Sequence, residues 1–383
     1  MTSFELKDIS IETLTKIIDA SFPDLNYKIN GTDIVFDELK SDNLSKIEVL
    51  IKICRFSARF SKKNMASVPE VNIDDDYYRM APSSDVNQLL ELNGELVWAG
   101  DGLATLSGDF LKLKKSLERY WLMVAENINA IEIENAALWS VDITNQAKYL
   151  DDFPHEAALV IGCKKNHDSV EKINNIFKKG LTNNADDLAG VLSEFQVLGM
   201  CQPSVCTSCY HALGAKKINS NGIYTTYNRV FRNEGRRSLD RLLSFTVRDL
   251  IAVGEEGFVR NWRSNFFGLA DKFIEDLDLP ISIEQATDPF FASAAEKLIV
   301  QQSAELKHEL LIDIPQTGNR IAIGSINLHL NVFGKRFDIY SNEKNVFSCC
   351  MGIGFERTAY AFMSYYGLDF KYWPEKQRKL LML

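Results

Sequence analysis

The stretch 227–254 carries charged and aromatic residues between two strand-like segments. The first segment ends in Arg232 and Glu234, an arginine-rich turn follows, and the second segment contains Phe245 and Asp249. Because side chains alternate along a strand, each of these pairs is expected on one face. A guanidinium binds phosphate, an aromatic ring takes a base and a carboxylate binds an amine, so the set suits a nucleoside triphosphate. A charged hairpin that only contacts solvent is the alternative interpretation.

A second stretch, 348–362, runs from a strand-like segment into a helix through two glycines. Gly352 and Gly354 would let a ligand approach the backbone closely, and Arg357 falls in the first turn of the helix. A glycine-rich strand entering a core helix is the alternative, because Gly-x-Gly alone is common. The two stretches together, about 100 residues apart, form a much rarer pattern than either alone.

The number and spacing of the cysteines indicate reduced thiols and not a set of disulfides. Their number, seven, is odd, and most of them sit close together in the sequence, which is typical of reduced thiols that can bind a metal. Cys206 and Cys209 have a metal-like Cys-x-x-Cys spacing, and Cys349 and Cys350 are adjacent. Buried thiols without a metal are the alternative.

Length and charge narrow the class of protein. A chain of 383 residues is long enough for two domains. Its formal charge of −9 argues against binding nucleic acid mainly through a basic surface. No apolar run reaches the roughly 18 residues of a membrane span, and the first residues do not have the pattern of a secretion signal. A cytoplasmic protein is expected.

The elements that must position these residues fall into two regions. Residues 1–92 predict a small helical bundle, with helices at 11–20, from 42 onward and from 85 onward. Residues 93–383 combine a long helix at 110–127 with several strand-like segments and further helices, including a short one at 193–198. Strands joined by short turns favour an antiparallel sheet flanked by helices, an α+β fold.

The two stretches resemble motifs 2 and 3 of class II aminoacyl-tRNA synthetases. The resemblance is closest to the atypical zinc-dependent seryl-tRNA synthetases and to their truncated relatives, the amino acid:[carrier protein] ligases, and covers residues 95–375. It implies the class II synthetase-type antiparallel sheet and an ATP site in which Mg²⁺ bridges the phosphates. By resemblance, Arg232 binds the α-phosphate and the substrate carboxylate, Glu234 lies near the adenine or the amine, Arg241 binds the terminal phosphates, Phe245 stacks on adenine, and Arg357 covers its other face and the γ-phosphate.

The resemblance also implies a zinc site. The zinc-dependent synthetases use Cys, Glu and Cys, and leave the fourth position for the amino group of the substrate. Cys206 matches the first ligand and Cys350 the third, whereas the middle position falls on Asp249, one methylene shorter than Glu. Aspartate also ligates zinc. Cys209 and Cys349 stay as alternative ligands.

Two departures concern the N-terminal region and the dimer. Residues 36–50 resemble the attachment region of acyl-carrier proteins, but Asn43 stands where that family has its serine. An amide cannot form the phosphodiester to phosphopantetheine, so a carrier-like domain that cannot be loaded is expected, with an unrelated helical bundle as the alternative. The motif 1 region, 134–138, lacks the usual proline of the dimer interface, although a homodimer is still expected.

The function that the resemblance implies is that of an ATP-dependent, AMP-forming ligase. It would activate a small amino acid (glycine, alanine or serine) as the aminoacyl adenylate and pass it to the phosphopantetheine thiol of a separate carrier protein. Ser325 and Asn327 are the expected substrate residues. Neither tRNA, given the acidic chain, nor a membrane is expected as a partner. The alternatives are transfer to tRNA or a small-molecule amine, and a non-catalytic scaffold, which would not need all five ATP-site residues.

Overall fold

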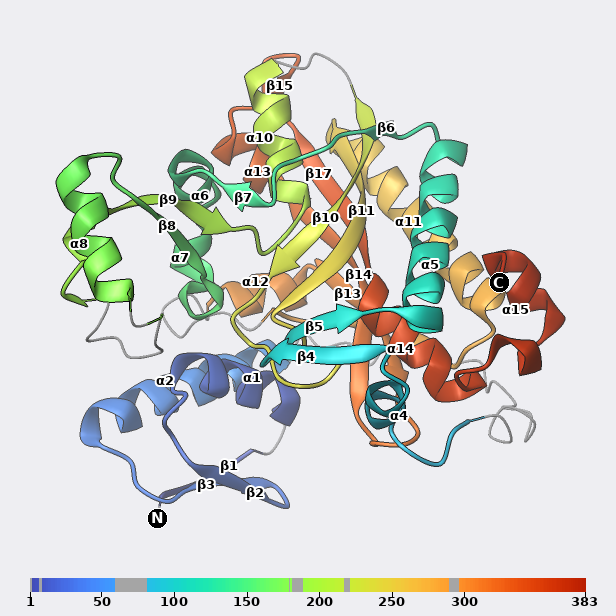
Figure 1. Ribbon diagram of the computed structural model, residues 1–383, viewed down its shortest axis with the longest axis horizontal. Coiled ribbons are helices and arrows are strands. Elements are labelled where there is room, and N and C mark those ends of the chain that lie inside the picture. The colour runs from blue at the N-terminus through green and yellow to red at the C-terminus, as the bar shows by residue number, and fades with distance from the viewer. Residues whose placement is uncertain are drawn as a thin grey trace.

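The computed structural model describes residues 2–6, 9–58, 81–178, 180, 189–216, 221–288 and 296–383. Its centre is a seven-stranded sheet with the strand order β12-β13-β14-β17-β11-β10-β6 (Figure 1). Neighbouring strands are antiparallel except β6, which is parallel to β10. The expected α+β fold with an antiparallel sheet is therefore confirmed. The strands are β6 (Ile131–Glu132), β10 (Gly222–Phe231), β11 (Ser244–Gly254), β12 (Ile281–Gln285), β13 (Lys307–Asp313), β14 (Arg320–Leu330) and β17 (Phe347–Gly354).

Long helices cover one face of this sheet and enclose the main hydrophobic core (Figure 1). The helix predicted at 110–127 is α5, which buries Phe110, Leu113, Leu117 and Trp121 along one side, as helical spacing requires. Helix α14 follows β17 directly, so the position of its first turn is fixed by the sheet. These helices are α5 (Gly108–Asn127), α11 (Glu256–Leu277) and α14 (Phe355–Tyr366), and the short helix α15 (Glu375–Leu381) packs against α5 and α11.

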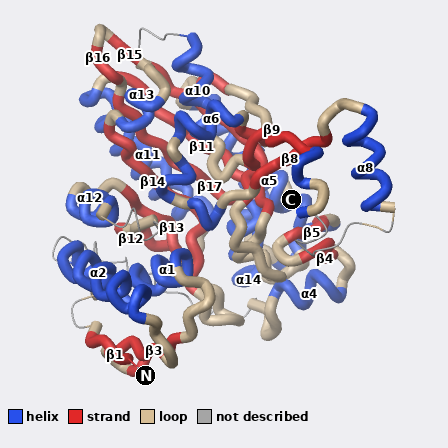
Figure 2. Tube along the Cα trace, turned by 90° about the vertical axis from the view of Figure 1, so that its left-hand side faces the viewer, coloured by secondary structure: helices blue, strands red, loops and turns tan. Residues whose placement is uncertain are grey.

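The opposite face of the sheet is covered at one end by a second core. There α10 (Cys206–Lys216) and α13 (Val332–Arg336) pack with Tyr224, Ile251 and Cys350 of the sheet. Figure 2 shows both helices at the same end of the strands. The rest of this face lines a large cavity, so the sheet has a structural face and an open face.

The remaining helices and strands of residues 81–383 are short. The expected helix at 193–198 is wrong, because 195–201 form strand β9, whose backbone pairs with β7 and β8. Among the described residues, none of the helices combines the length and apolar character needed to cross a membrane. The short elements are β4 (Leu96–Gly100), β5 (Leu103–Leu106), β7 (Leu138–Trp139), β8 (Leu159–Cys163), β9 (Phe195–Cys201), β15 (Tyr340–Ser341), β16 (Lys344–Asn345), α4 (Val86–Leu92), α6 (Val141–Ala147), α7 (Tyr149–Asp152), α8 (His167–Phe177) and α12 (Lys297–Ser303), with 3₁₀ turns Pro154–Glu156, Leu192–Glu194 and Phe370–Tyr372.

The N-terminal unit is not the helical bundle that was expected. Helices α1 (Ile11–Ser21) and α2 (Ser41–Ser57) form as predicted, but three antiparallel strands, β1 (Thr2–Glu5), β2 (Tyr27–Asn30) and β3 (Asp33–Phe36), pack with them. Gly31, with φ +60°, begins the two-residue turn between β2 and β3, as hairpins require. The comparison with a purely helical carrier domain is therefore corrected. Asn43 lies in the first turn of α2.

The packing also moves the boundary between the two units. Val86 and Leu90 of α4 are buried in the main core, so α4 packs with the C-terminal region although it precedes residue 93. Leu298 of α12 is buried in the N-terminal core. Figure 2 shows α12 between α2 and the large sheet. The N-terminal core thus includes one side chain from a helix outside the N-terminal unit.

Candidate active site

The register of the large sheet brings the predicted site residues into two adjacent rows. Asp249 of β11 pairs with Gly352 of β17, which pairs with Ser325 of β14. Two residues further along the strands, Cys350 of β17 pairs with Asn327 of β14. Because paired residues point to the same face of a sheet, these side chains share the open face and line its cavity of about 1400 Å³.

All ten predicted site residues line this one cavity. They come from α10, from strands β11, β14 and β17, from the first turn of α14 and from the arginine loop, which we define as residues 232–243 between β10 and β11. Alternation predicted that Arg232 and Glu234 end the first strand. Strand β10 ends at Phe231 instead, so both residues lie in the arginine loop. The residues are Arg232, Glu234, Arg241, Phe245, Arg357, Ser325, Asn327, Cys206, Asp249 and Cys350.

Two guanidinium groups lie near the ring of Phe245. The Cζ atom of Arg232 is 5.6 Å and that of Arg357 is 5.8 Å from the ring centre, within the range of cation–π contacts. Arg232 Nε donates to the carbonyl of Pro203 at 3.3 Å, and Arg357 donates to that of Ala322 at 3.1 Å. Backbone acceptors therefore fix both side chains beside the ring.

The arginines make this part of the cavity cationic. Arg241 forms an ion pair of 2.9 Å with Glu234. Burial, together with the charges of Arg241 and Arg232 and against that of Glu234, lowers the pKa of Arg357 to about 10. Burial opposes ionisation of Glu234, but Arg241, Arg232 and Arg357 together hold the pKa of its carboxyl below the usual value. Three guanidinium groups around one carboxylate favour a ligand with several negative charges.

Tyr149 and Glu156, which were not among the predicted site residues, lie close to Arg232. Tyr149 donates a short hydrogen bond to the carboxylate of Glu156, and both residues line the cavity. Burial opposes the charge of Arg232, but Glu156, Tyr149 and Glu234 raise its pKa overall. These residues come from α7 and the following 3₁₀ turn, far from Arg232 in sequence, so only the fold reveals their proximity.

The three predicted metal ligands lie together. Each of Cys206, Asp249 and Cys350 offers an atom within 4.8 Å of the other two, and all three residues are buried. A hydrogen bond to Cys206 and burial raise the pKa of Cys350. Burial raises the pKa of Asp249 to about 7, against the hydrogen bond from Cys206 and the charge of Arg232. A bound cation would reverse this preference for the neutral forms.

The alternative ligands lie elsewhere. Cys209 is buried with Tyr210 and Leu213 in the core under α10, and the described residues that form the ligand group do not include it. Cys349 points to the other face of the sheet and donates to the carbonyl of Val259 at 3.4 Å. Two sulfur ligands and one carboxylate with room for a fourth ligand fit Zn²⁺, so Asp249 suits the middle position better than either cysteine.

Ser325 and Asn327 lie on the far side of the metal ligands from the arginine loop. Asn327 Nδ2 donates to Ser325 Oγ at 3.0 Å and lies 3.7 Å from Cys350 Sγ. His329, next along the same face of β14, has Nε2 3.7 Å from the same sulfur. Polar groups therefore continue from the metal ligands along β14.

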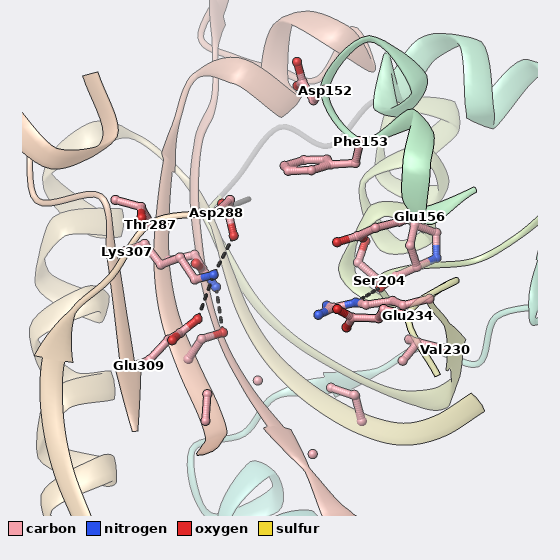
Figure 3. Close-up of a pocket in the computed structure, with 18 of the residues that line it drawn as sticks. Asp152, Phe153, Glu156, Ser204, Val230, Glu234, Thr287, Asp288, Lys307 and Glu309 are labelled. Atoms are coloured by element: carbon pink, nitrogen blue, oxygen red, sulfur yellow. Dashed lines mark hydrogen bonds and ion pairs between the residues drawn. The ribbon is translucent and has the colours of Figure 1, made fainter. Parts of the chain in front are cut away.

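A buried ionic cluster that the sequence analysis missed closes this side of the cavity. Lys307 Nζ lies 2.5 Å from Asp288 and 2.9 Å from Glu309, and Gln301 Nε2 donates to Asp288 at 2.6 Å. Figure 3 shows this cluster across the cavity from Glu156 and Glu234. Lys307 and Glu309 alternate on a strand, a pattern too common to be singled out from sequence.

The N-terminal unit supplies the outer wall beside this cluster. Leu14, Ile17 and Ile18 of α1 are buried in the N-terminal core, whereas Lys16 lines the cavity, together with Asp19, Ala20 and Pro23. Thr13 Oγ1 lies 3.4 Å from Thr287 Oγ1 of the C-terminal region. Helix α1 therefore has one side in its own core and another on the cavity.

Sequence comparisons find relatives that are named as ligases. No protein-family model matches the chain. The amino acid--[acyl-carrier-protein] ligase 1 of Bradyrhizobium diazoefficiens is 33% identical over 155 residues, covering 40% of this chain and 48% of that ligase. The chain thus spans about half the length of that relative. A type-2 serine--tRNA ligase of Methanococcus maripaludis is 22% identical over 97% of this chain and 78% of its own length.

Solved structures show the fold. The seryl-tRNA synthetase of M. kandleri, in complex with A. aeolicus tRNASec, matches 99% of this chain and 76% of its own with a TM-score of 0.70 and 14% identity. The seryl-tRNA synthetase of Pyrococcus horikoshii, complexed with ATP, matches 85% of this chain and 75% of its own with a TM-score of 0.54 and 10% identity. The chain is thus related to the carrier-protein ligases and type-2 serine--tRNA ligases, and it has the class II fold of seryl-tRNA synthetases.

Proposed function

We propose that this protein activates an amino acid with ATP and transfers the aminoacyl group to the phosphopantetheine thiol of a carrier protein. The observation that carries the proposal is the arrangement of one cavity. Arg232 and Arg357 flank Phe245, and the ligand group Cys206, Asp249 and Cys350 lies on the same open face of the sheet. A cationic site beside a soft metal site suits a nucleotide next to an amine.

In the first step, an oxygen of the amino acid carboxylate attacks the α-phosphorus of ATP. The new P–O bond forms as the bond to pyrophosphate breaks, which gives the aminoacyl adenylate. Arg232 orients the carboxylate and the α-phosphate, while Arg241 and Arg357 neutralise the departing pyrophosphate. Such a reaction depends on positioning and charge compensation more than on proton transfer. Mg²⁺ would accompany the phosphates, and Zn²⁺ held by Cys206, Asp249 and Cys350 would bind the amine of the substrate.

In the second step, the sulfur of the carrier thiol attacks the carbonyl carbon of the adenylate. A thioester forms as the bond to AMP breaks, and the thiol proton leaves with AMP or solvent. The names of two relatives, amino acid--[acyl-carrier-protein] ligases 1 and 2 at 33% and 34% identity, support this acceptor. Ser325 and Asn327 would contact the side chain of a small amino acid, of which serine, glycine and alanine are the candidates.

Transfer to tRNA is the second candidate function. It is favoured by the extent of the similarity, because the type-2 serine--tRNA ligase and the tRNA-bound M. kandleri enzyme match nearly all of this chain. That match includes the N-terminal unit, where the described strands exclude a purely helical carrier domain. As with related class II enzymes, we propose a homodimer, despite the missing proline at 134–138.

The test of the first step is ATP–pyrophosphate exchange with each proteinogenic amino acid, with and without added zinc. We expect exchange with one small amino acid, and loss of it after chelation. The test of the acceptor then offers the radiolabelled amino acid to a phosphopantetheinylated carrier and to total tRNA. A labelled thioester supports the ligase, and labelled tRNA supports the second candidate. Zinc-loaded protein that exchanges with none of them would contradict activation of these amino acids and favour the scaffold.

A further inference from the structure

The arginine loop is held in place by a segment that lies far from it in sequence. Inside the loop, Arg236 N donates to the carbonyl of Arg241 at 2.8 Å, and Arg241 N donates to that of Ser238 at 3.0 Å. These bonds shape the tip but do not attach it to the rest of the protein. Attachment comes from the buried side chains of Leu239 and Leu242 and from polar contacts to residues 85–102. Asn233 N also donates to the carbonyl of Glu156 at 3.3 Å, and Asn319 Nδ2 donates to Asp240 Oδ2 at 3.4 Å.

Asn87, in the first turn of α4, makes the shortest polar contact to the tip from outside the loop. Its Oδ1 accepts the backbone N–H of Leu239 at 2.9 Å, and its Nδ2 lies 3.4 Å from Ser238 Oγ. The same Nδ2 donates to both oxygens of Asp85 at 3.1 and 3.2 Å. Asn87 is only 5% exposed, so losing this amide would leave the Leu239 N–H buried without its acceptor, which is costly.

Asp85 connects the same group to the helix that carries Arg357. It begins α4 by accepting the N–H of Asn87 at 3.1 Å, a typical N-cap. It also accepts the hydroxyl of Tyr360 of α14 at 3.0 Å. A chain of hydrogen bonds therefore runs from α14 through Asp85 and Asn87 to the tip of the arginine loop, so the elements that carry Arg357 and Arg241 share one support.

The turn between β4 and β5 holds the other end of the loop. Gly102 accepts the N–H of Leu243 at 2.9 Å, and its neighbour Asp101 pairs with Arg237 at 3.2 Å. Gly102 has φ +67°, and a Cβ there would come within 2.6 Å of Gly235 Cα. This contact is tight and needs glycine. The loop is thus fixed at its end by the turn and at its tip by Asn87.

We propose that Asn87 is a positioning residue of the nucleotide site: its amide holds the tip of the arginine loop and thereby places Arg241. The inference rests on the proposed function for the identity of the ligand, ATP. The hydrogen bonds that carry it do not depend on that identity. Asn87 itself lies outside the cavity lining, so it acts through the loop and not on the ligand.

The experiment compares Asn87→Ala, Asn87→Leu and Asn93→Ala in the full chain. Asn87→Leu keeps the bulk but removes the hydrogen bonds. The exposed Asn93, at the other end of the same helix, is the matched control. Two quantities are measured: amide hydrogen exchange of the peptide covering 236–243, and the dissociation constant of ATP with Mg²⁺ by titration calorimetry. From the usual worth of one hydrogen bond, both Asn87 variants should exchange faster in this peptide and bind ATP about 3- to 10-fold more weakly. Asn93→Ala should match the unmodified protein in both.

The outcomes separate the inference from the proposed function. Unchanged loop exchange in Asn87→Ala would overturn the positioning role. Recovery of both quantities in Asn87→Leu would assign the effect to packing and also overturn it. Faster loop exchange with unchanged ATP affinity would show that the loop is held by Asn87 but that its placement does not serve ATP. If the unmodified protein does not bind ATP, the proposed function fails, while the loop exchange still tests the hydrogen bond.

Discussion

Gly352 of β17 lies directly beside Asp249 of β11, and a Cβ atom on Gly352 would come within 2.3 Å of Asp249 Oδ1. The glycine therefore provides the space in which the shorter carboxylate reaches the two cysteines. Gly354, two residues along the same strand, differs in this respect. A Cβ there would meet its nearest atom, the carbonyl oxygen of Ile323, at 3.8 Å, which is an ordinary contact.

Replacing Gly352 by alanine should therefore abolish metal binding. The methyl group must displace the Asp249 carboxylate, and the ligand group would lose one of its three members. Zinc content after gel filtration, measured by inductively coupled plasma mass spectrometry, checks this. We expect close to one zinc per chain before the change and almost none after it. Gly354→Ala is the matched control and should keep its zinc. Full zinc in Gly352→Ala would argue against Asp249 as a ligand.

Replacing Arg232 by alanine should abolish activation of the amino acid while the fold is kept. Arg232 is the guanidinium nearest Phe245, and its loss removes charge compensation where the new bond forms, an effect of about 100-fold or more. ATP–pyrophosphate exchange measures the loss, and circular dichroism verifies the fold. The exposed Arg229, on β10, serves as the control in Arg229→Ala. Retained exchange in the Arg232 variant would refute the assignment of this site.

Replacing Lys16 should weaken binding of the amino acid and leave binding of ATP unchanged. It lines the cavity from the N-terminal unit. Burial opposes ionisation of Glu309, but Lys307 and then Lys16 hold the pKa of that carboxyl below its usual value. Lys16→Gln should raise the KM for the amino acid about 2- to 5-fold, as expected for the loss of one partly exposed charge, and leave the KM for ATP unchanged. The exposed Lys28 of β2 gives the control, Lys28→Gln. Equal effects of both changes would show that the N-terminal wall plays no part in substrate binding.

His308 should make the protein sensitive to acid. Burial and then the charge of the neighbouring Arg263, against a smaller opposing effect of Glu305, together lower the pKa of His308 to about 4. The unfolded chain, with a histidine pKa near 6.5, binds this proton more readily. Stability from His308 is therefore lost as the pH falls from about 6.5 towards about 4.

The measurement is the melting temperature of His308→Gln relative to the unmodified protein between pH 7 and 4.5. Because the variant lacks this titration, the unmodified protein should lose melting temperature faster than the variant as the pH falls. His167→Gln is the control, since that side chain is 87% exposed. A constant difference across the range for His308→Gln would contradict the burial of an uncharged His308.

The sequence could predict the parts of the site that lie on neighbouring strands. Alternation placed Phe245 and Asp249 on one face, and the fold does so because both belong to the regular strand β11. Contacts between residues that meet only through tertiary packing could not be predicted from the sequence. Asn87 lies on a helix remote in sequence from the arginine loop, and nothing in its spacing indicates the partner.

The helices of the N-terminal unit could be predicted from the sequence, but its strands could not. Helices α1 and α2 follow from the spacing of their apolar residues, and both were predicted. Strands β1, β2 and β3 have four residues each, too few for alternation to be distinguished from an irregular segment. Their pairing depends on the turn at Gly31 and on the helices that cover them.

The burial of Leu298 in the N-terminal core has a consequence for how the chain unfolds. With a side chain of the C-terminal region inside its core, the N-terminal unit has no complete interior when it is excised, and a fragment ending at residue 58 should be largely unstructured. In the intact protein, loss of the N-terminal unit would expose Leu298 and loosen α12, which holds Asp288 through Gln301. The two regions are therefore expected to melt in a single cooperative transition, so the division visible along the sequence is not a division between independent folding units.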